Sequence, residues 1–401
     1  MVKTKTSKIA KIFASLCLCF VFALSLFSFV GCTKKYPKNA IVISSYEELK
    51  SFLDSYAEND MIDSAVAEEG KYVVISKDID CEGNTLTPLL SADYYGLGFK
   101  FDGDGHTISN FTLDESCIRH VGTAPGTSAG EFAVLSLFPR SEGGEICNIT
   151  FKDVKVELNN YNIGAEENAI RIGIVGYSKS SGSNDSSVSG FSASKYKNIN
   201  IENMSVKVTT SSASTARKYV FSVGALIGLD ADTTQSGTNL ETTTPKAVRE
   251  NIKVTNFNVD ITTTGGPVFV GGVAGQVNWE LVSYKNCSVD GKVTVANYGS
   301  DTGSFVRGSL GSVVSAGGIV GGILKAQYVV DVIDCEVDLD YYITSVRPDE
   351  LVTIGRYMGV VLESSNADTD LSMITVSNSE DKSALIINSS VSEIESDYVA
   401  K

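Results

Sequence analysis

Hydrophobic and polar residues alternate with a period of two along most of the chain beyond residue 71. The stretch from Gly271 to Val295, "GGVAGQVNWELVSYKNCSVDGKVTV", contains two alternating runs rich in Val. Such alternation of β-branched residues is typical of strands that bury one face. Because no 3.6-residue apolar stripe is sustained outside the N-terminal region, the pattern predicts an all-β fold.

One segment near the N-terminus has helical periodicity instead. In "SSYEELKSFLDSYAEND", apolar residues recur at Leu49, Phe52, Leu53 and Tyr56, the spacing of one helical face. A Ser followed three residues later by a Glu precedes this run and has the form of a capping box. We therefore predict that residues 44–70 form a helical cap at one end of the β-rich part.

Two short phrases recur through the β-rich part at uneven intervals. The first is Asn or Asp, an apolar residue, any residue and a second apolar residue, with copies 35 to 53 residues apart. Its copies begin at Asn110, Asn148, Asn198, Asn251, Asn286 and Asp334. The second is a glycine phrase such as "GGVAG" or "GGIVG". Its copies end at Gly176, Gly228, Gly275, Gly321 and Gly359.

Two phased signals with strand-like alternation indicate a solenoid of β coils. A propeller blade needs four strands, whereas each unit here offers two or three short ones. We predict a parallel β-helix (solenoid) of about six to eight coils over residues 71–401.

The repeated Asn predicts a structural ladder. Coils stack about 4.8 Å apart, so an Asn at the same corner of each coil can pass side-chain hydrogen bonds to its neighbours. We expect these side chains to turn inward, where unpaired polar groups would cost several kcal/mol, followed by inward aliphatic residues at the next and third positions. The glycines are expected on the opposite wall, with positive φ and close backbone approach.

Three phrases resemble known families. "FDGDGHTISNFTL", from Phe101, is similar to the first full coil of pectate-lyase-like right-handed β-helices. "GGVAGQVNWELVSYKNCSVDG" and "GGIVGGILKAQYVVDVIDCEVD" resemble the GLUG motif, a short repeat of bacterial surface proteins. The resemblance implies a right-handed coil. It does not imply one activity, because β-helices include lyases, hydrolases, adhesins and passive scaffolds.

The N-terminus has the layout of a targeting segment. Four lysines within the first eleven residues precede an uncharged apolar stretch from Ile12 to Val30. Small Gly31 stands directly before Cys32, so the segment resembles a bacterial lipoprotein signal peptide, which is cleaved before a cysteine that becomes diacylated. The resemblance implies a signal peptide at 1–31, lipid attachment at Cys32 and a tether over 32–43.

An uncleaved membrane anchor is the alternative for this segment. In either case we expect the rest of the chain to lie outside the cytoplasm, at the cell membrane or cell surface, with the membrane as a partner through the anchor.

The charge balance argues against nucleic acid as a partner. The full chain has a net charge of −15, and removal of residues 1–31 leaves 29 basic and 48 acidic residues, a net charge of −19. Such a surface repels phosphate backbones.

The cysteines favour a core role over chemistry. Removal of the signal and acylation of Cys32 leave five cysteines with no Cys-x-x-Cys spacing: Cys81, Cys117, Cys147, Cys287 and Cys335. Neither a zinc site nor a disulfide framework is indicated. Cys287 and Cys335 share a column of adjacent coils, and we favour two reduced, buried thiols over a disulfide there.

No catalytic constellation is evident. The two histidines, His106 and His120, lack a positioned partner in the sequence pattern. Asp102 and Asp104 lie in a "DGDG" turn whose later positions do not match an EF-hand calcium loop. We therefore assign no catalytic residue, no metal site and no cofactor.

Candidate binding residues lie in the connections. Ser/Thr-rich insertions after Tyr177 and Leu229 leave one side of the coil, where repeat proteins commonly place binding surface. Trp279, Tyr94 and Tyr95 are candidate sugar platforms, although shielding of the coil from water is the favoured role for aromatics here.

The sequence therefore favours a lipid-anchored, non-catalytic envelope protein that acts in adhesion or binds a neutral glycan or a surface protein. The alternative is a polysaccharide lyase or glycoside hydrolase with an unrecognised site.

Overall fold

The chain divides into two units, Met1–Ala40 and Ile41–Lys401. The computed structural model describes residues 36–58, 72–89, 97–121, 132–161, 169–179, 193–210, 220–231, 247–278, 282–299, 313–324, 330–345, 352–362, 374–377, 380–381 and 385–387. In the first unit this covers only a turn, in which the Ala40 N–H donates to the Pro37 carbonyl at 2.9 Å. The second unit is nearly all β, so the predicted all-β class is confirmed.

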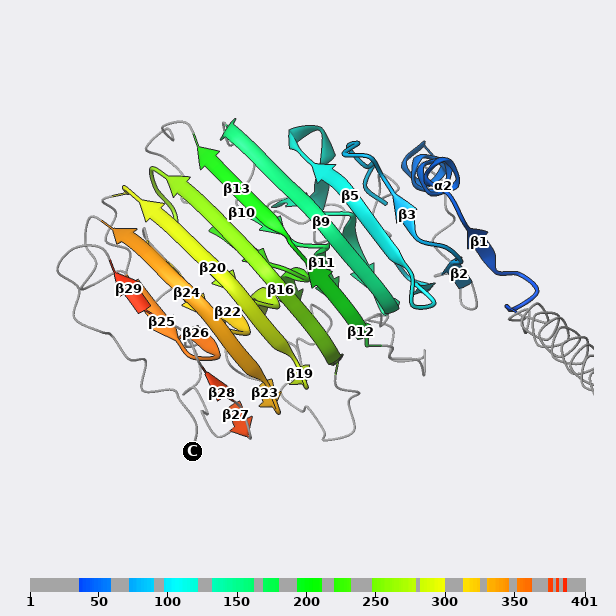
Figure 1. The fold of residues 1–401 in the computed structure, drawn as a ribbon. Helices are drawn as coiled ribbons and strands as arrows, with labels where there is room; N and C mark the ends of the chain where they lie inside the picture. The colour runs from blue at the N-terminus through cyan, green and yellow to red at the C-terminus, as the bar shows by residue number, and fades with distance from the viewer. Residues whose placement is uncertain are drawn as a thin grey trace, which may run out of the picture. The chain divides into compact units, whose positions relative to one another are not determined.

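Three sheets make up the second unit (Figure 1). The described strands of sheet A are β1 (Ile41–Ile43), β2 (Tyr72–Ile75), β3 (Ile79–Asp80), β4 (Lys100–Asp102), β5 (Thr107–Leu113), β9 (Glu145–Tyr161), β12 (Lys195–Glu202), β13 (Ser205–Thr210), β16 (Ala247–Thr263), β19 (Val282–Lys285), β20 (Ser288–Asn297), β23 (Val330–Ile333), β24 (Glu336–Ser345), β27 (Ile374–Ser377), β28 (Glu380–Asp381) and β29 (Leu385–Ile387). Those of sheet B are β8 (Phe138–Glu142), β11 (Val175–Lys179), β15 (Ile227–Ala231), β18 (Ala274–Asn278), β22 (Val320–Leu324) and β26 (Met358–Leu362). Those of sheet C are β6 (Ile118–Val121), β7 (Phe132–Leu135), β10 (Ala169–Ile172), β14 (Val220–Gly224), β17 (Val268–Gly271), β21 (Val314–Gly317) and β25 (Val352–Gly355). A short 3-10 turn, η1 (Glu115–Cys117), precedes β6.

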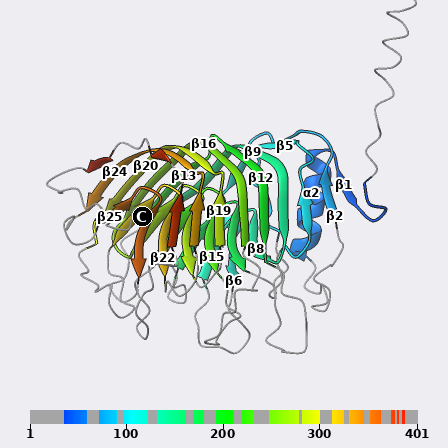
Figure 2. The ribbon, with the colours of Figure 1, turned by 90° about the horizontal axis from the view of Figure 1, so that it is seen from below.

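From β7 onward the chain visits sheets C, B and A in a fixed order. Each strand pairs in parallel with its equivalent one passage later, so equivalent residues form columns through the sheets. One such column in sheet C runs through Ile170, Phe221, Val268, Val314 and Val352. Among the described pairs, only β6 with β7 is antiparallel. Figure 2 shows the strands side by side in a row that runs from the N-terminal to the C-terminal end of the second unit.

The predicted helix, α2 (Tyr46–Glu58), lies at the N-terminal end of this row of strands (Figure 2). Its start has capping-box contacts, since the Glu48 N–H donates to Ser45 Oγ while the Glu48 carboxylate accepts from Ser44. Leu49 and Leu53 are buried in the main core, as their spacing predicts. The described part of the helix runs to Glu58, and residues 59–70 of the predicted cap lie outside the described residues.

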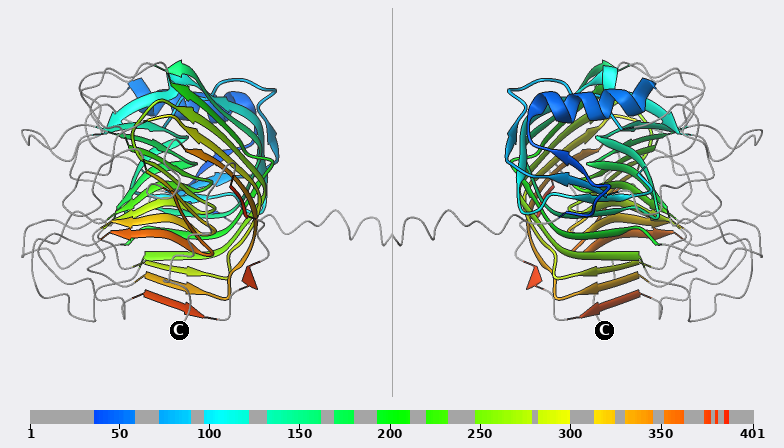
Figure 3. Two further views of the ribbon diagram at one scale, coloured as in Figure 1. Left: turned by 90° about the vertical axis from the view of Figure 1, so that its left-hand side faces the viewer. Right: turned by 90° about the vertical axis from the view of Figure 1, so that its right-hand side faces the viewer.

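The second unit has two interiors. In both views of Figure 3, the long strands of sheet A curve around the shorter strands of the other two sheets. The main core lies between sheet A and sheets B and C, and contains most of the buried Val, Ile, Leu and Phe residues. A smaller cluster lies between sheets B and C and includes Val134, Tyr177 and Leu229. Sheets B and C are therefore buried on both faces, as parallel sheets usually are.

The repeated glycines allow sheets B and C to approach each other. A Cβ on Gly176 would lie 2.8 Å from Val134 Cβ and Ser136 Oγ, and one on Gly275 would lie 2.6 Å from the Val223 backbone nitrogen. The expected close approach is present. The expected positive φ is not, because Gly176 and Gly275 have ordinary φ, and the left-handed conformation belongs to other residues described below.

Among the described residues, which begin at 36 and leave out the apolar stretch from Ile12 to Val30, no helix is long and apolar enough to cross a membrane.

Candidate functional site

The Asn side chains form a continuous hydrogen-bonded column on sheet A. Each Nδ2 donates to the Oδ1 of the residue one coil earlier, over 2.6 to 3.1 Å. We call this the first Asn column; in chain order it contains Asp102, Asn148, Asn198, Asn251 and Asn286, with Asp334 next to Asn286. The backbone of the four Asn and of Asp334 is left-handed, with φ between 52° and 56°.

This column faces outward, so the expectation of inward-turning Asn side chains is wrong. Asn198, Asn251 and Asn286 are exposed, whereas the next and third residues after each are buried. The left-handed conformation bends the strand at the Asn, and the side chain then lies on the convex side of the bend. Asn suits this position because it tolerates the left-handed region better than most residues do.

A second Asn column lies on the same sheet, five residues further along each strand. Asn256 donates to Asn203 at 3.0 Å, Asn203 donates to Asp153 at 2.8 Å, and Asn110 donates to Asp80 at 2.9 Å. Asn110 pairs in register with Asp153, so it belongs to this second column. The sequence repeat had placed it in the first column, and that assignment is wrong. All four residues from Asn110 to Asn256 have φ between 53° and 57°.

The sequence did contain the signal for this second column. The phrases "DVKV" at Asp153, "NMSV" at Asn203 and "NFNV" at Asn256 obey the same rule that located the first column. At β9, β12–β13 and β16, each coil therefore carries at least two left-handed Asn or Asp corners where one was expected.

Both columns have a direction, because every described amide donates toward the N-terminal coils. In the first column, this series ends at the Asp102 carboxylate, which also accepts from the Tyr72 hydroxyl at 2.5 Å. Burial alone would raise the pKa of Asp102, but these hydrogen bonds and the nearby Lys100 outweigh it and lower the pKa. The amide of Asn110 and the N–H of Glu82 similarly lower the pKa of Asp80.

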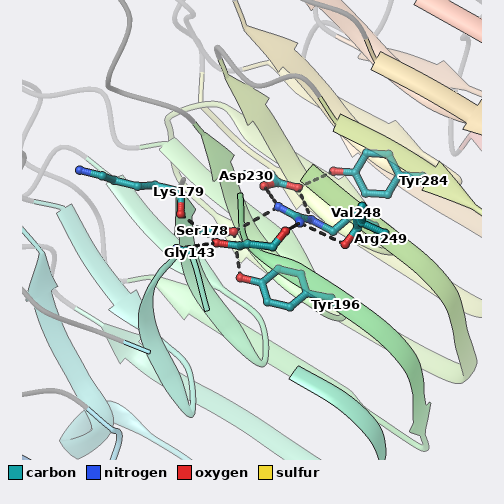
Figure 4. A network of polar contacts seen from close by, with 9 residues as sticks. Gly143, Ser178, Lys179, Tyr196, Asp230, Val248, Arg249 and Tyr284 are labelled. Carbon is teal, nitrogen blue, oxygen red and sulfur yellow. Dashed lines mark hydrogen bonds and ion pairs between the residues drawn. The ribbon is translucent and has the colours of Figure 1, made fainter. Parts of the chain in front are cut away.

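A fully buried ion pair connects three successive coils (Figure 4). Arg249 binds the Asp230 carboxylate through Nε at 2.9 Å and Nη2 at 2.5 Å, and neither side chain is exposed to solvent. The Tyr284 hydroxyl donates at 2.9 Å to Asp230 Oδ2, the oxygen that also accepts from Arg249 Nε. The guanidinium also lies over the Tyr196 ring, 4.4 Å from its centroid.

The same guanidinium reaches the strands on both sides of residues 180–192. Its Nη1 donates to the Ser194 carbonyl at 2.7 Å and its Nη2 to Ser178 Oγ at 3.2 Å. The Tyr196 hydroxyl donates to Ser178 Oγ at 2.8 Å. We call Ser178, Ser194, Tyr196, Asp230, Arg249 and Tyr284 the arginine clamp.

The clamp was missed at the sequence level, although the strand pattern held a signal. In "AVRENIKV", Arg249 occupies an inward position of the alternation, next to buried Ala247 and Ile252. A charged residue at an inward position predicts a buried partner.

A second buried arginine lies between sheets B and C. Arg171 donates to Gln276 Oε1, and burial lowers the pKa of the Arg171 guanidinium to about 9. Buried polar atoms without a hydrogen-bond partner in the described region include Ser136 Oγ, Arg140 Nε and Gln276 Nε2.

An open groove of about 270 Å³ lies on the outer side of sheet A, at the N-terminal end of the second Asn column. Asp80, Glu82, Asn110, Thr112, Asp153 and Lys155 contribute to its lining.

The remaining residues singled out from the sequence have varied outcomes. Cys32, Tyr94, Tyr95 and Trp279 lie outside the described residues. His106 Nδ1 lies 3.3 Å from an exposed Asp78 oxygen, at the start of β5.

All five cysteines that were expected in the core are buried and outside any disulfide, as favoured for Cys287 and Cys335. Burial raises the pKa of the Cys81 and Cys147 thiols to about 12, so both are protonated at neutral pH. Within the described ranges, no three His, Cys, Asp or Glu side chains gather as metal ligands would.

No protein-family model matches the chain, and no curated protein matches it. Among solved structures, the chain is similar to the crystal structure of a "putative immunoglobulin A1 protease" from Bacteroides ovatus. The two share 16% sequence identity with a TM-score of 0.45, over 89% of this chain and 80% of that one.

Proposed function

We propose that this chain is a lipid-anchored, extracytoplasmic parallel β-helix that acts by binding, in adhesion or in capture of a neutral glycan, and not by catalysis. Three features support it: the fixed order of sheets C, B and A, the GLUG-like phrases, and the lipoprotein-like N-terminus. The arginine clamp is the observation on which the binding role depends most.

The clamp joins the strand ends that flank three successive connections from sheet B to sheet A. Residues 180–192 lie between Ser178 and Ser194, and residues 232–246 lie between Asp230 and Arg249. Residues 279–281, which begin with Trp279, directly precede the strand that holds Tyr284. One guanidinium thereby fixes the bases of both Ser/Thr-rich insertions.

A buried ion pair is an expensive way to stabilise a core. Removing two charges from water costs several kcal/mol per ion, and apolar residues of similar volume often stabilise as well or better. Retaining such a pair is more easily understood where the relative position of the joined segments matters. We therefore assign the binding surface to the side of the protein that carries these connections.

Trp279 provides the test of this assignment. Trp279→Ala should weaken binding to a neutral polysaccharide by about 1 to 2 kcal/mol, because one aromatic platform is lost. Isothermal titration calorimetry with soluble neutral polysaccharides measures this. Tyr342→Ala is the matched control, since Tyr342 lies on the outer face of β24 beside Lys292.

Equal affinities for Trp279→Ala and the unchanged protein, with Tyr342→Ala weakened, would place the binding surface on sheet A instead. Loss of the folded β signal in circular dichroism would assign Trp279 a structural role.

The anchor has a separate test. Cys32→Ser should release the chain from the membrane fraction or leave it unprocessed, because the diacyl group that holds it is not attached. The same mature mass and the same membrane association would refute lipid attachment at Cys32.

A further inference from the structure

The groove on sheet A lies where the second Asn column is interrupted. Asn256 donates to Asn203 and Asn203 to Asp153, and the donors resume with Asn110 to Asp80. Between Asp153 and Asn110 there is no such bond, because an ionised carboxylate has no hydrogen to donate. The groove spans this interruption, since both residues line it.

Two hydrogen-bond acceptors therefore face each other across one coil spacing. Neighbouring strand positions lie about 4.8 Å apart. Asn110 uses its Nδ2 on Asp80, which leaves its Oδ1 toward Asp153, and one Asp153 oxygen already accepts from Asn203. The register pairs Ser109 with Lys152 and Phe111 with Val154, on either side of this Asn110 and Asp153 pair.

We propose that this groove binds a vicinal diol of a neutral sugar. Two adjacent hydroxyl groups supply two donors at short separation, one for Asn110 Oδ1 and one for the Asp153 carboxylate. The exposed Lys155 ammonium lines the same groove and supplies a donor to a further sugar oxygen. A volume of about 270 Å³ suits one sugar unit of a longer chain.

The neighbouring carboxylate of Asp80 is already engaged. It accepts from Asn110 Nδ2 at 2.9 Å and from the Glu82 N–H at 2.8 Å through the same oxygen. The diol site therefore consists of the Asn110 and Asp153 acceptors, with Asp80 as the residue that orients the Asn110 amide. This site is distinct from the surface assigned to Trp279, and it can fail without affecting that assignment.

One substitution distinguishes loss of the diol site from damage to the fold. Asp153→Asn supplies the missing amide, which can donate to Asn110 Oδ1 and complete the column. We expect this variant to unfold at a higher temperature than the unchanged protein and to lose the diol site in the same step. The combination is specific, because simple damage to the site would lower the unfolding temperature.

Asp334→Asn is the matched control. In the first Asn column, Asp334 follows Asn286 on the next coil, and Asn286 uses its Nδ2 on Asn251. The substitution makes the same chemical change at the far end of sheet A, away from the groove. It should also raise the unfolding temperature, but it should leave sugar binding unchanged.

The probe is methyl α-D-glucopyranoside, and methyl α-D-mannopyranoside is a second neutral glycoside. Binding of each to the full chain is measured by saturation-transfer NMR. Both unchanged protein and Asp334→Asn should give a signal, and Asp153→Asn should reduce the affinity about tenfold or more, as expected for loss of a charge-assisted hydrogen bond. The fully O-methylated glycoside, which lacks donors, should give no signal.

Three results would overturn the proposal. The first is no signal with either glycoside, and the second is an equal signal from Asp153→Asn. The third is calcium chloride binding that requires Asp153 and displaces the glycoside, which would make the groove a cation site.

Discussion

The left-handed corner is the residue-scale feature that organises sheet A. A non-glycine residue in this conformation costs about 1 to 2 kcal/mol, and the described coils repeat it in two columns. Asn reduces this cost and adds a side-chain amide that bonds to the coils on both sides. The Asn residues are thus selected for backbone conformation and for the ladder together, although their side chains are exposed.

Asn251 is a sharp test of the two roles, because it bonds to Asn198 and Asn286 at 2.8 and 2.6 Å. Asn251→Leu should lower the free energy of unfolding by about 1 to 3 kcal/mol, since it loses the ladder bonds and strains the corner. Asn251→Gly loses the same bonds but removes the strain. Chemical denaturation should therefore rank Gly above Leu. The same stability for Leu and Asn would show that neither role matters.

The sequence predicted that an Asn ladder exists. It did not predict that the side chains face outward or that there are two columns. The residue after each ladder position is buried, as at Ile199 and Ile252, so strand alternation alone would have placed Asn198 and Asn251 outside. The cost of burying unpaired amides is therefore no reason to place these side chains inside. The second column follows the same sequence rule, with a further match five residues after Asn148, Asn198 and Asn251.

At the scale of elements, the glycine phrases explain how two sheets pack with little space between them. Ser222 and Ser315 of sheet C donate across this interface to the Gly228 and Gly321 carbonyls of sheet B, at 2.6 and 2.7 Å. Such bonds require a sheet separation too small for a Cβ at the facing positions. The phrase therefore specifies an interface, where the sequence had suggested a corner.

Gly275→Ala tests this packing. The added Cβ would lie 2.6 Å from the Val223 backbone nitrogen and 2.5 Å from Ser222 Oγ, so backbone must move. We expect a loss of about 1 to 3 kcal/mol in the free energy of unfolding, as for other overpacked sites.

Gly265→Ala is the control, since a Cβ there meets nothing within 4 Å. Equal denaturation midpoints for the two variants would contradict the close packing of sheets B and C.

The alternation of apolar residues was enough to predict an all-β chain, and the helical spacing from Leu49 to Tyr56 was enough to predict the N-terminal helix. It could not predict the interior between sheets B and C. A strand buried on both faces, such as β17 with "VFVG", has no alternation to reveal which side meets which neighbour.

At the scale of the whole molecule, the arginine clamp holds successive coils in one arrangement. Arg249 of β16 binds Asp230 of β15, contacts Ser178 and Ser194 one coil earlier, and shares Asp230 with Tyr284 one coil later. Disturbing it should therefore affect several coils at once.

Arg249→Met should lower the free energy of unfolding by about 3 to 5 kcal/mol, because it leaves the Asp230 carboxylate buried without its cation. Combining Arg249→Met with Asp230→Leu should recover much of this loss, since no buried charge remains. Urea denaturation of the two variants checks both expectations. A single variant as stable as the unchanged protein would mean that the pair is not buried in solution.

The informative outcome is a double variant that regains the stability lost in Arg249→Met but does not regain glycan binding. The apolar pair keeps the coils together but no longer bonds to Ser178 and Ser194. If the clamp serves to position the connections, glycan affinity should remain reduced although the fold is restored.

The most direct test of the binding role is to follow binding and turnover in one experiment. The full chain is titrated with plant, host and envelope polysaccharides while bound polysaccharide, new reducing ends and unsaturated products are measured together. A non-catalytic binding protein should give saturable binding to a neutral polysaccharide, which is recovered at its original length. Shortened or unsaturated chains that accumulate beyond one equivalent of protein would contradict this and identify a polysaccharide lyase or hydrolase.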